Sequence, residues 1–404
     1  MRGSHTENTG IGTRSVWGGE DEYLLQGATQ VPVVYSVGYG YDDIDQWHEV
    51  ALGIRPGHIY GRNTNPTVHV FEEKIRLLEG AEAATSFSTG MAAISGTLFT
   101  LLRPGDRVVS LVDTYGGTNK IFSEFLPNFH IEPVLCPTTD HESIIREVQK
   151  GAQVLYLESP TNPTLKVVDL KRLIEAAHAV GALVVVDNTF ATPINQHPIA
   201  LGADLVIHSA TKFLGGHADA LGGVVCGRED LVSQIYHYRE INGATLHPMS
   251  AYLLLRGMKT LHLRVRQQCA SAMRIAQFLA NHDAVEKVYY PGLEDHENHH
   301  IAAQQMEQFG GVLSFSLKGG FESVRSFLPN LHYAHLAANL GAVETTAGPP
   351  RTTSHVELTA QERARLGIPE TLIRYSVGIE DPEDLIQDLA QGLERMAYEL
   401  DLRS

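Results

Sequence analysis

Short apolar segments alternate with amphipathic helices along residues 63–258, and this alternation constrains the fold more than any other feature of the sequence. The buried-type strands are residues 107–112, 154–157, 183–186 and 205–207. Between them, Asp169 can cap a helix with an apolar stripe, and the Thr-x-x-Glu spacing from Thr139 predicts another helix start. Nearly continuous apolar strands between helices are typical of parallel strands. We therefore expect an α/β fold with a mostly parallel sheet covered on both faces.

The flanking segments have a different character. Residues 1–62 lack a clear period and are predicted to form an extended arm, and residues 1–5 resemble a tag remnant. Alternating residues at 313–317 and 373–377 predict strands with one solvent-facing side. We expect three parts, which are an N-terminal arm (1–62), a large domain (63–258) and a smaller C-terminal α+β domain (259–404).

Composition excludes several classes of protein. The chain has 31 basic and 47 acidic residues and a net charge of −16, which disfavours binding to nucleic acid or to anionic membranes. No apolar run approaches the roughly 18 residues that span a bilayer, and the first twenty residues contain no secretory apolar region. We expect no membrane and no nucleic-acid partner.

Cysteine and histidine spacing give no metal or disulfide pattern. The three cysteines, Cys136, Cys226 and Cys269, match no zinc or CxxC motif, and their odd number favours a reducing cytoplasm. The histidines at 296, 299 and 300 follow a Pro-Gly turn in a charged stretch, so a solvated loop is the better interpretation than a metal site. We predict no metal ligands.

Polar residues follow the predicted strands at the edge of the sheet where ligands bind in open α/β folds. These residues include Asp113 to Gly117, Glu158 to Pro163, Asp187, and His208 to Lys212. The segment Ser88-Thr89-Gly90-Met91 precedes an apolar helix, whose N-terminal amides can bind an anion. A lysine, an acid, an aromatic ring and a hydroxyl-lined anion cradle are the groups that pyridoxal phosphate requires.

Motifs over residues 55–395 resemble the trans-sulfuration (Cys/Met metabolism) family of pyridoxal-phosphate enzymes, which includes cystathionine γ-synthase and γ-lyase. The motifs, in family order, are Tyr60-Gly61-Arg62, Ser88 to Ala93, Tyr115 to Thr118, Glu158 to Pro163, Val186 to Phe190, Ser209 to Gly216, Leu255 to Leu261, Leu340-Gly341 with Glu344, and Arg374 to Asp381. The resemblance implies the aspartate-aminotransferase-like fold (fold type I), with a large domain and a smaller C-terminal domain. It also implies a cytoplasmic homotetramer, a dimer of dimers whose active sites are shared between subunits.

The resemblance assigns roles residue by residue. Lys212 would carry the cofactor and act as the base, with Tyr115 stacked on the ring and assisting proton transfer. The other cofactor-binding positions are Ser88, Gly90, Met91, Asp187, Thr189, Ser209 and Thr211, together with Tyr60 and Arg62 from the neighbouring subunit. The substrate-binding positions are Asn162, Asn339 and Arg374, of which Arg374 would clamp the α-carboxylate.

Several positions depart from the family pattern on the substrate side. Methionine γ-lyases usually have cysteine where this chain has Gly117, which disfavours that activity. Asn339 replaces the usual serine, Gly61 replaces serine or threonine, and the stretch 347–351 is atypical. These departures leave the cofactor machinery intact and point to a second substrate other than cysteine.

The resemblance implies γ-replacement or γ-elimination on an activated homoserine-type amino acid through a vinylglycine-type intermediate, with a separate nucleophile in the replacement reaction. An alternative within the family forms a carbon–carbon bond at Cγ, with S-adenosylmethionine or another unusual γ-donor. Two other classes remain open. A nucleotide-binding oxidoreductase is disfavoured because Gly38-x-Gly40 is too short for a dinucleotide motif, and the other is an inactive scaffold or metal-binding module.

Overall fold

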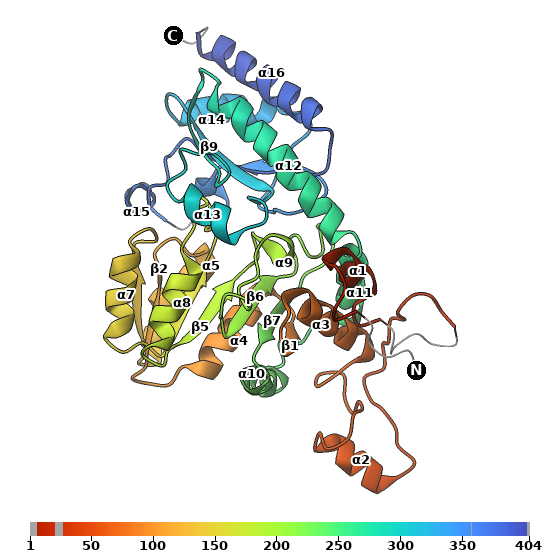
Figure 1. Ribbon diagram of the computed structural model, residues 1–404. Coiled ribbons are helices and arrows are strands. Elements are labelled where there is room, and N and C mark those ends of the chain that lie inside the picture. The colour runs from red at the N-terminus through yellow and green to blue at the C-terminus, as the bar shows by residue number, and fades with distance from the viewer. Residues whose placement is uncertain (1–5, 21–26, 357, 402–404) are drawn as a thin grey trace.

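Two β-sheets organise the computed structural model, which describes residues 6–20, 27–356 and 358–401 (Figure 1). The larger sheet contains β1 (Ala83–Phe87), β2 (Arg107–Leu111), β3 (Glu132–Cys136), β4 (Val154–Glu158), β5 (Leu183–Asp187), β6 (Leu205–Ser209) and β7 (Gly223–Gly227). Its order is β1-β7-β6-β5-β4-β2-β3. Strands β2 to β6 are parallel, whereas β7 pairs antiparallel with β1 and β6. This topology confirms the predicted α/β fold with a mostly parallel sheet.

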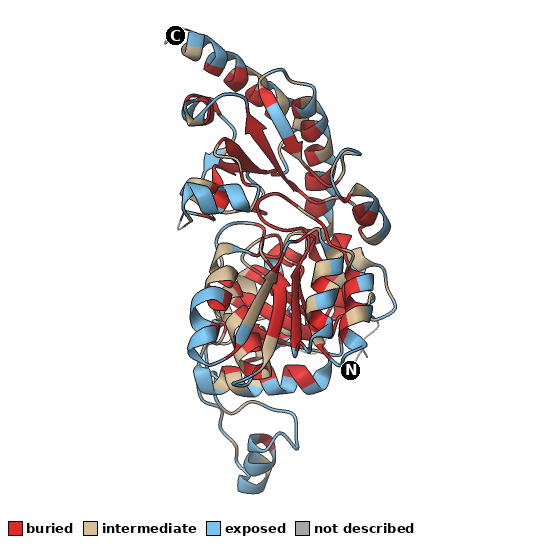
Figure 2. Ribbon diagram, turned by 90° about the vertical axis from the view of Figure 1, so that its left-hand side faces the viewer, coloured by how far each residue is buried: buried red, intermediate tan, exposed pale blue. Residues whose placement is uncertain are grey.

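Helices cover both faces of this sheet (Figures 1 and 2). They are α3 (Pro66–Glu79), α4 (Gly90–Leu101), α5 (Gly116–Lys120), the π-helical turn η1 (Ile121–Phe125), α6 (Leu126–Asn128), α7 (His141–Gln149), α8 (Leu170–His178), α9 (Thr192–Asn195), α10 (Glu229–Asn242) and α11 (Pro248–Met258). Apolar residues of α4 and α10 pack on one face, and those of α7 and α8 pack on the other. Asp169 caps α8 as predicted, but α7 is capped by Asp140, whose Oδ1 accepts the Ser143 N–H at 2.9 Å, and not by Thr139.

The smaller sheet has the order β10-β11-β12-β9-β8 and lies above the larger one (Figure 1). Its strands are β8 (Val285–Tyr289), β9 (Val312–Leu317), β10 (His335–Leu336), β11 (Thr346–Gly348) and β12 (Leu372–Ser376). The accompanying helices are α12 (Leu261–Ala280), α13 (His299–Gln305), α14 (Phe321–Phe327), η2 (Leu328–Asn330), η3 (Pro350–Thr352), α15 (Ala360–Arg365) and α16 (Pro382–Asp401). Helices α12, α14 and α16 contribute to the apolar core on one face of this sheet.

The prediction of a solvent-facing side for β9 and β12 is wrong, because every residue of both strands is buried. The polar residues of these strands face segments of the larger sheet instead of water. Ser314 Oγ, for example, donates a hydrogen bond to the Pro163 carbonyl at 2.7 Å. Strand β12 therefore delivers Arg374 into an interior site and not onto a surface.

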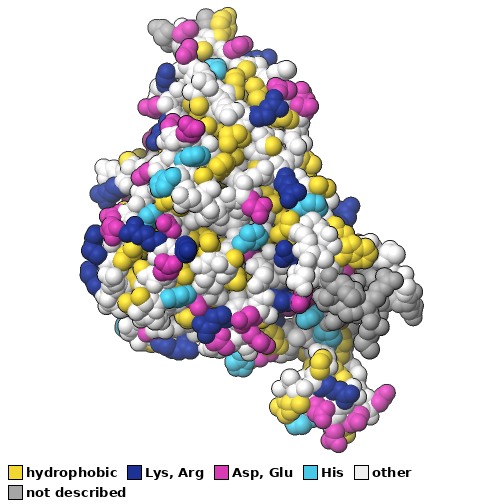
Figure 3. Space-filling view, viewed as in Figure 1, with side chains coloured by type: hydrophobic (Ala, Val, Ile, Leu, Met, Phe, Trp, Pro, Cys, Tyr) yellow, Lys and Arg dark blue, Asp and Glu magenta, His cyan; other side chains and the backbone are white. Residues whose placement is uncertain are grey.

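The N-terminal segment is only partly the extended arm that the sequence predicts. It contains α1 (Ile11–Trp17) and α2 (Ile44–Ala51), and α1 packs against α3 and α12. Lys74 Nζ anchors α1 by donating to the carbonyls of Ser15 and Val16 at 3.0 Å each. Helix α2 and its flanking loops instead project away from the body (Figures 1 and 3). The suggested tag remnant, residues 1–5, lies outside the described residues.

The histidine-rich stretch is more ordered than a solvated loop. His296 is half-buried, and burial lowers its pKa to about 4, while His299 opens α13. Within the described ranges, no group of three or more His, Cys, Asp or Glu is arranged to hold a metal ion. Across the same ranges, no helix is both long and apolar enough to cross a membrane.

We predict that Gly257→Ala lowers the stability of the protein. A Cβ atom at Gly257, inside α11, would lie 2.0 Å from the carbonyl oxygen of Gly215, in the loop that follows Lys212. The backbone shift that relieves this clash should cost about 1–3 kcal/mol, which outweighs the better helix propensity of alanine. The control is Gly320→Ala, where a Cβ would meet nothing within 4 Å. Equal unfolding midpoints for the two variants in urea would contradict this packing argument.

Candidate active site

A cavity of about 260 Å³ lies where the carboxyl ends of β4, β5 and β6 meet the N-terminus of α4 and strand β12. It brings together ten of the residues predicted from the sequence, which are Gly90, Met91, Tyr115, Asn162, Asp187, Thr189, Ser209, Thr211, Lys212 and Arg374. Seven of these residues end or follow parallel strands, and two belong to α4. The sheet topology makes these segments neighbours. Arg374 comes from the smaller sheet, so the site lies between the two sheets.

Lys212 lies in the loop that follows β6, and its side chain points to the substrate side of the cavity. Its Nζ donates a hydrogen bond to Asn339 Oδ1 at 3.0 Å. Burial and, to a smaller extent, the positive charge of Arg374 together lower the pKa of Lys212 to about 8. An amine with such a pKa is partly neutral near physiological pH, as a nucleophile or general base must be.

Asp187 ends β5 and is buried at the floor of the cavity. Its Oδ1 accepts the Thr189 N–H at 3.0 Å, and its Oδ2 accepts the Tyr156 hydroxyl at 3.4 Å. Burial raises the pKa of Asp187, while the Thr189 hydrogen bonds and the positive charge of His208 oppose this rise. A cationic ring nitrogen beside this carboxylate would offset its desolvation and favour the ionised form.

The N-terminus of α4 forms an anion cradle. Thr89 caps the helix, and its hydroxyl accepts the Ala92 N–H at 3.0 Å. Gly90 packs so closely on β6 that a Cβ there would lie 2.7 Å from the Ser209 Cβ, which allows backbone amides and hydroxyls to converge. The prediction for Ser88 differs from the structure, because Ser88 does not line the cavity and its N–H donates to the Ala244 carbonyl at 2.9 Å.

Arg374 forms a buried cationic position with two asparagines. Its Nη1 donates to Asn162 Oδ1 at 3.3 Å, and its Nη2 donates to the Asn339 carbonyl at 3.1 Å. Burial lowers the pKa of Arg374 to about 10, so the guanidinium stays charged at neutral pH. Asn339 therefore contacts both Lys212 and Arg374, which places an amine and a carboxylate-binding group side by side.

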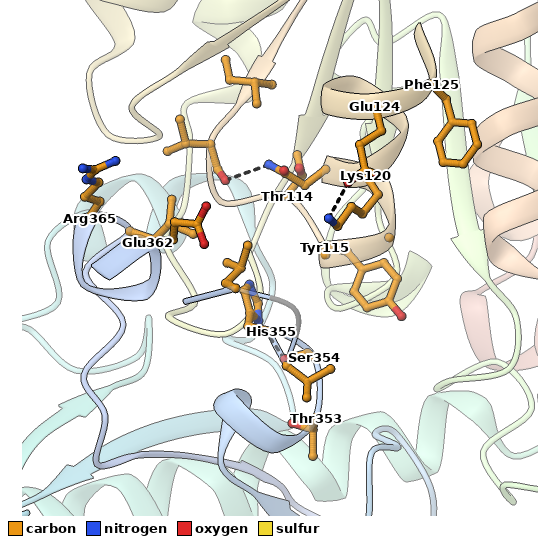
Figure 4. A pocket seen from close by; sticks show the side chains of 18 residues that line it. Thr114, Tyr115, Lys120, Glu124, Phe125, Thr353, Ser354, His355, Glu362 and Arg365 are labelled. Atoms are coloured by element: carbon orange, nitrogen blue, oxygen red, sulfur yellow. Dashed lines mark hydrogen bonds and ion pairs between the residues drawn. The ribbon is translucent and has the colours of Figure 1, made fainter. Parts of the chain in front are cut away.

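Tyr115 lines both this cavity and a second, outer chamber of about 680 Å³, whose lining residues are drawn in Figure 4. Tyr115 is 42% exposed, and Thr353 and Ser354 also line both spaces. His355 lines the outer chamber, with its Nδ1 2.9 Å from Ser354 Oγ. Burial, with the charges of two nearby arginines, lowers the pKa of His355 to about 4, so the ring is neutral near pH 7.

Tyr60 and Arg62 lie away from the cavity of their own chain. Tyr60 is 45% exposed, and Arg62 donates to the Glu240 carbonyl at the end of α10. Sequence reasoning gave no individual role to the other residues that line the cavity, which are Thr89, Ile94, Glu158, Phe190, Leu221, Ala338, Leu340, Thr353 and Ser354. The sequence does signal Thr89, which precedes a helix as its cap, and Glu158, which ends a strand. Thr353 and Ser354 lie in an irregular segment whose sequence gives no such signal.

We predict that the rate at which pyridoxal phosphate attaches covalently to the cofactor-free protein rises with pH through about 8. Only the neutral Lys212 amine attacks the aldehyde, so the profile follows the deprotonation of Lys212. Stopped-flow absorbance measures this rate, with Lys212→Arg as the control that forms no bond at this site. A midpoint near the ordinary lysine value of 10.5 would contradict a desolvated amine.

The chain is similar in sequence and structure to known pyridoxal-phosphate enzymes. A family model described as Cys/Met metabolism PLP-dependent enzyme matches residues 12–394. The L-methionine gamma-lyase of Fusobacterium nucleatum subsp. polymorphum is 42% identical, covering 97% of this chain and 100% of that protein. The cystathionine gamma-lyase of Bacillus subtilis is 40% identical, covering 92% and 95%. A solved cystathionine gamma synthase from Xanthomonas oryzae pv. oryzae, in complex with aminoacrylate and cysteine, superposes with a TM-score of 0.92 at 38% identity, covering 96% and 99%.

The residues of the cavity fit pyridoxal phosphate. A partly neutral amine, a buried carboxylate and a helix N-terminus held open by Gly90 match its aldehyde, ring nitrogen and phosphate, respectively. The similarity extends over nearly the whole chain, and the fold agrees with that of the solved relative. The protein therefore belongs to the Cys/Met metabolism family of enzymes and uses pyridoxal phosphate as its cofactor.

Proposed function

We propose that the protein catalyses γ-replacement or γ-elimination on an activated homoserine-type amino acid. The observation that carries this proposal is the Lys212–Asn339–Arg374 contact, which places a partly neutral amine beside a buried carboxylate-binding guanidinium. An amino acid whose carboxylate binds Arg374 presents its Cα and Cβ hydrogens to this region. The names of the relatives, methionine gamma-lyase, cystathionine gamma-lyase and cystathionine gamma synthase, support the same reaction class.

The protein residues divide the work between binding and proton transfer. When bound, pyridoxal phosphate supplies the ring that accepts electrons from the substrate. Arg374 and Asn162 bind and orient the α-carboxylate. Lys212 would take a proton from Cα, give that proton up to the bound cofactor, and then take one from Cβ, while Asn339 Oδ1 holds the Lys212 amine on that side of the cavity. The Asp187 carboxylate would pair with the ring nitrogen, and the hydroxyls of Ser209 and Thr211 would hold the phosphate.

The outer chamber gives room for the γ-substituent or for the incoming nucleophile (Figure 4). The inner cavity must hold both cofactor and amino acid in about 260 Å³, so a longer γ-substituent has to extend past Tyr115 and Ser354. Gly117 lies at this passage, and a Cβ there would be 2.9 Å from the Met91 Sδ. The absence of a side chain at Gly117 thus lets Met91 and Tyr115 lie close together at this passage.

A substrate panel tests this proposal. O-acylhomoserines, methionine, cystathionine and S-adenosylmethionine are incubated with the holoenzyme, with and without nucleophiles, and products are identified by mass spectrometry. We expect turnover of at least one activated homoserine, and complete loss of turnover in Lys212→Ala with an unchanged unfolding midpoint. A product with a new carbon–carbon bond at Cγ would instead identify the carbon–carbon-forming reaction. No product from any donor, or undiminished turnover in Lys212→Ala, would refute the proposal.

We further propose that the protein is a homo-oligomer, a dimer of dimers, in which each N-terminal arm reaches a neighbouring active site. The projecting part carries exposed apolar side chains on and beside α2, including Ile44 at 79%, Trp47 at 48% and Ile54 at 71% exposure (Figure 3). Such a patch on a projecting segment favours a protein partner, and a second copy of the chain is the partner that symmetry supplies most readily. Tyr60 and Arg62 would then contact the neighbour's cofactor phosphate.

Mixing two inactive variants tests the shared site. One variant, Lys212→Ala, lacks the base in its own site. The other variant, Arg62→Ala, lacks the arginine that would contact the phosphate in the neighbouring subunit's site. After dissociation and reassociation, random mixed dimers should regain about a quarter of wild-type activity, because half of the dimers are mixed and each mixed dimer has one intact site. Unmixed variants serve as controls. Mixed samples no more active than the unmixed ones would contradict a shared site.

We also propose a cytoplasmic location for the protein and a division of its chain into three parts. The three cysteines are buried and unpaired, which supports a cytoplasmic protein. We propose that residues 63–258 form the cofactor-binding domain and residues 259–404 the smaller domain, with the active site between them. Residues 1–62 would be the segment shared with the neighbouring subunit.

A further inference from the structure

Glu158 occupies a central position in the site that neither the cofactor nor the substrate chemistry requires. It ends β4, is 5% exposed, and lines the inner cavity. In the register of the sheet it lies directly opposite Asp187 on β5. Its carboxylate oxygens accept two backbone hydrogen bonds, one from the Tyr115 N–H at 2.8 Å and one from the Asn162 N–H at 3.2 Å. One side chain thus joins two loops that carry site residues.

Tyr115 is held on its N-terminal side by this contact, while its carbonyl accepts the Asn119 N–H at 2.9 Å. It precedes α5 and is the cap residue of that helix, but its side chain makes no capping hydrogen bond. Tyr115 is 42% exposed as a residue, so packing against neighbours restrains it only partly. The hydrogen bond from its backbone N–H to Glu158 Oε2 fixes the position of the Tyr115 backbone, from which the ring extends into the cavity lining.

Asn162 has the complementary role on the substrate side. Its backbone N–H donates to Glu158 Oε1, while its side-chain Oδ1 accepts a hydrogen bond from Arg374 Nη1 at 3.3 Å. Strands β2 and β4 are neighbours in the sheet, so the loops that follow them lie side by side, with the Glu158 carboxyl between them. A shift of this carboxyl would move both loops together.

We propose that Glu158 is a positioning residue whose carboxyl group holds the Tyr115 ring over the cofactor and holds Asn162 against Arg374. The burial of this carboxyl beside Asp187 is costly, because desolvation and the neighbouring negative charge both raise the pKa of Glu158 well above its usual range. The two backbone donors act in the opposite direction. Glu158 is thus buried beside Asp187 and also makes one hydrogen bond to each of the two loops.

Variants of Glu158 test the proposal in the full-length holoenzyme. Glu158→Ala removes both acceptors, and we expect cofactor affinity to fall about tenfold, as the loss of a buried hydrogen-bond partner predicts. The visible circular dichroism of the bound cofactor should change, because the ring loses its ordered stacking partner. The KM for the amino acid should rise more than kcat falls, because Asn162 and Arg374 bind its carboxylate. Glu158→Gln keeps one acceptor oxygen and should give intermediate values.

Asp388→Asn is the matched control. Asp388 is another buried carboxylate, 3% exposed, that accepts the N–H groups of His332 and Tyr333 at 2.9–3.0 Å, far from the site. This control should lower the unfolding temperature without altering cofactor affinity, circular dichroism or KM. Should Glu158→Ala and Glu158→Gln behave like this control, with wild-type cofactor affinity and circular dichroism, the role of Glu158 is only structural and the proposal fails.

The cofactor measurements do not depend on the proposed substrate. If the wild-type enzyme turns over no activated homoserine, the proposed function fails, while affinity and circular dichroism still decide the role of Glu158. If turnover is found and the Glu158 variants keep wild-type cofactor binding, only the positioning role is refuted. If Glu158→Ala does not fold, Glu158→Gln alone decides between the two outcomes, because it replaces the carboxyl by a group of the same size.

Discussion

The burial of charged groups at the ends of parallel strands is the constraint on which the site depends. Asp187 and Glu158 lie opposite each other on β5 and β4, and both carboxyls are removed from water. Desolvation makes each of them costly, and the surrounding donors from Thr189, Tyr115 and Asn162 offset part of that cost. A cofactor with a cationic ring nitrogen would complete this arrangement, because it would place a positive charge beside the buried carboxylate of Asp187.

Desolvation lowers the pKa values of the buried cationic side chains, whereas it raises those of the buried carboxyls. Burial lowers the pKa of Lys212 to about 8 and that of Arg374 to about 10. The consequences differ because the ordinary pKa values differ: the lysine becomes available as a base, whereas the arginine stays cationic and can bind a carboxylate. The interface between the two sheets thus yields a base and an anion-binding group within reach of the same asparagine.

The irregular segments give the family fold its individual character. Thr353 and Ser354 separate the inner cavity from the outer chamber, and Asn339 contacts both Lys212 and Arg374. None of these residues belongs to the larger sheet. The cavity therefore combines residues at the ends of parallel strands with residues from segments around the smaller sheet.

The sequence by itself determined the α/β architecture, the cofactor, and ten of the residues that line the cavity. Apolar strands such as 154–157 and 183–186 are recognisable because both of their faces are buried, and the strand end at Asp187 and the loop position of Lys212 follow from that pattern. Tertiary structure alone decided the rest. The alternation in β9 and β12 suggested a wet face, but packing between the sheets buries both sides and turns Arg374 inward. The role of Glu158 and the passage at Thr353 depend on loops distant in sequence, and only the folded chain brings such groups within hydrogen-bonding distance.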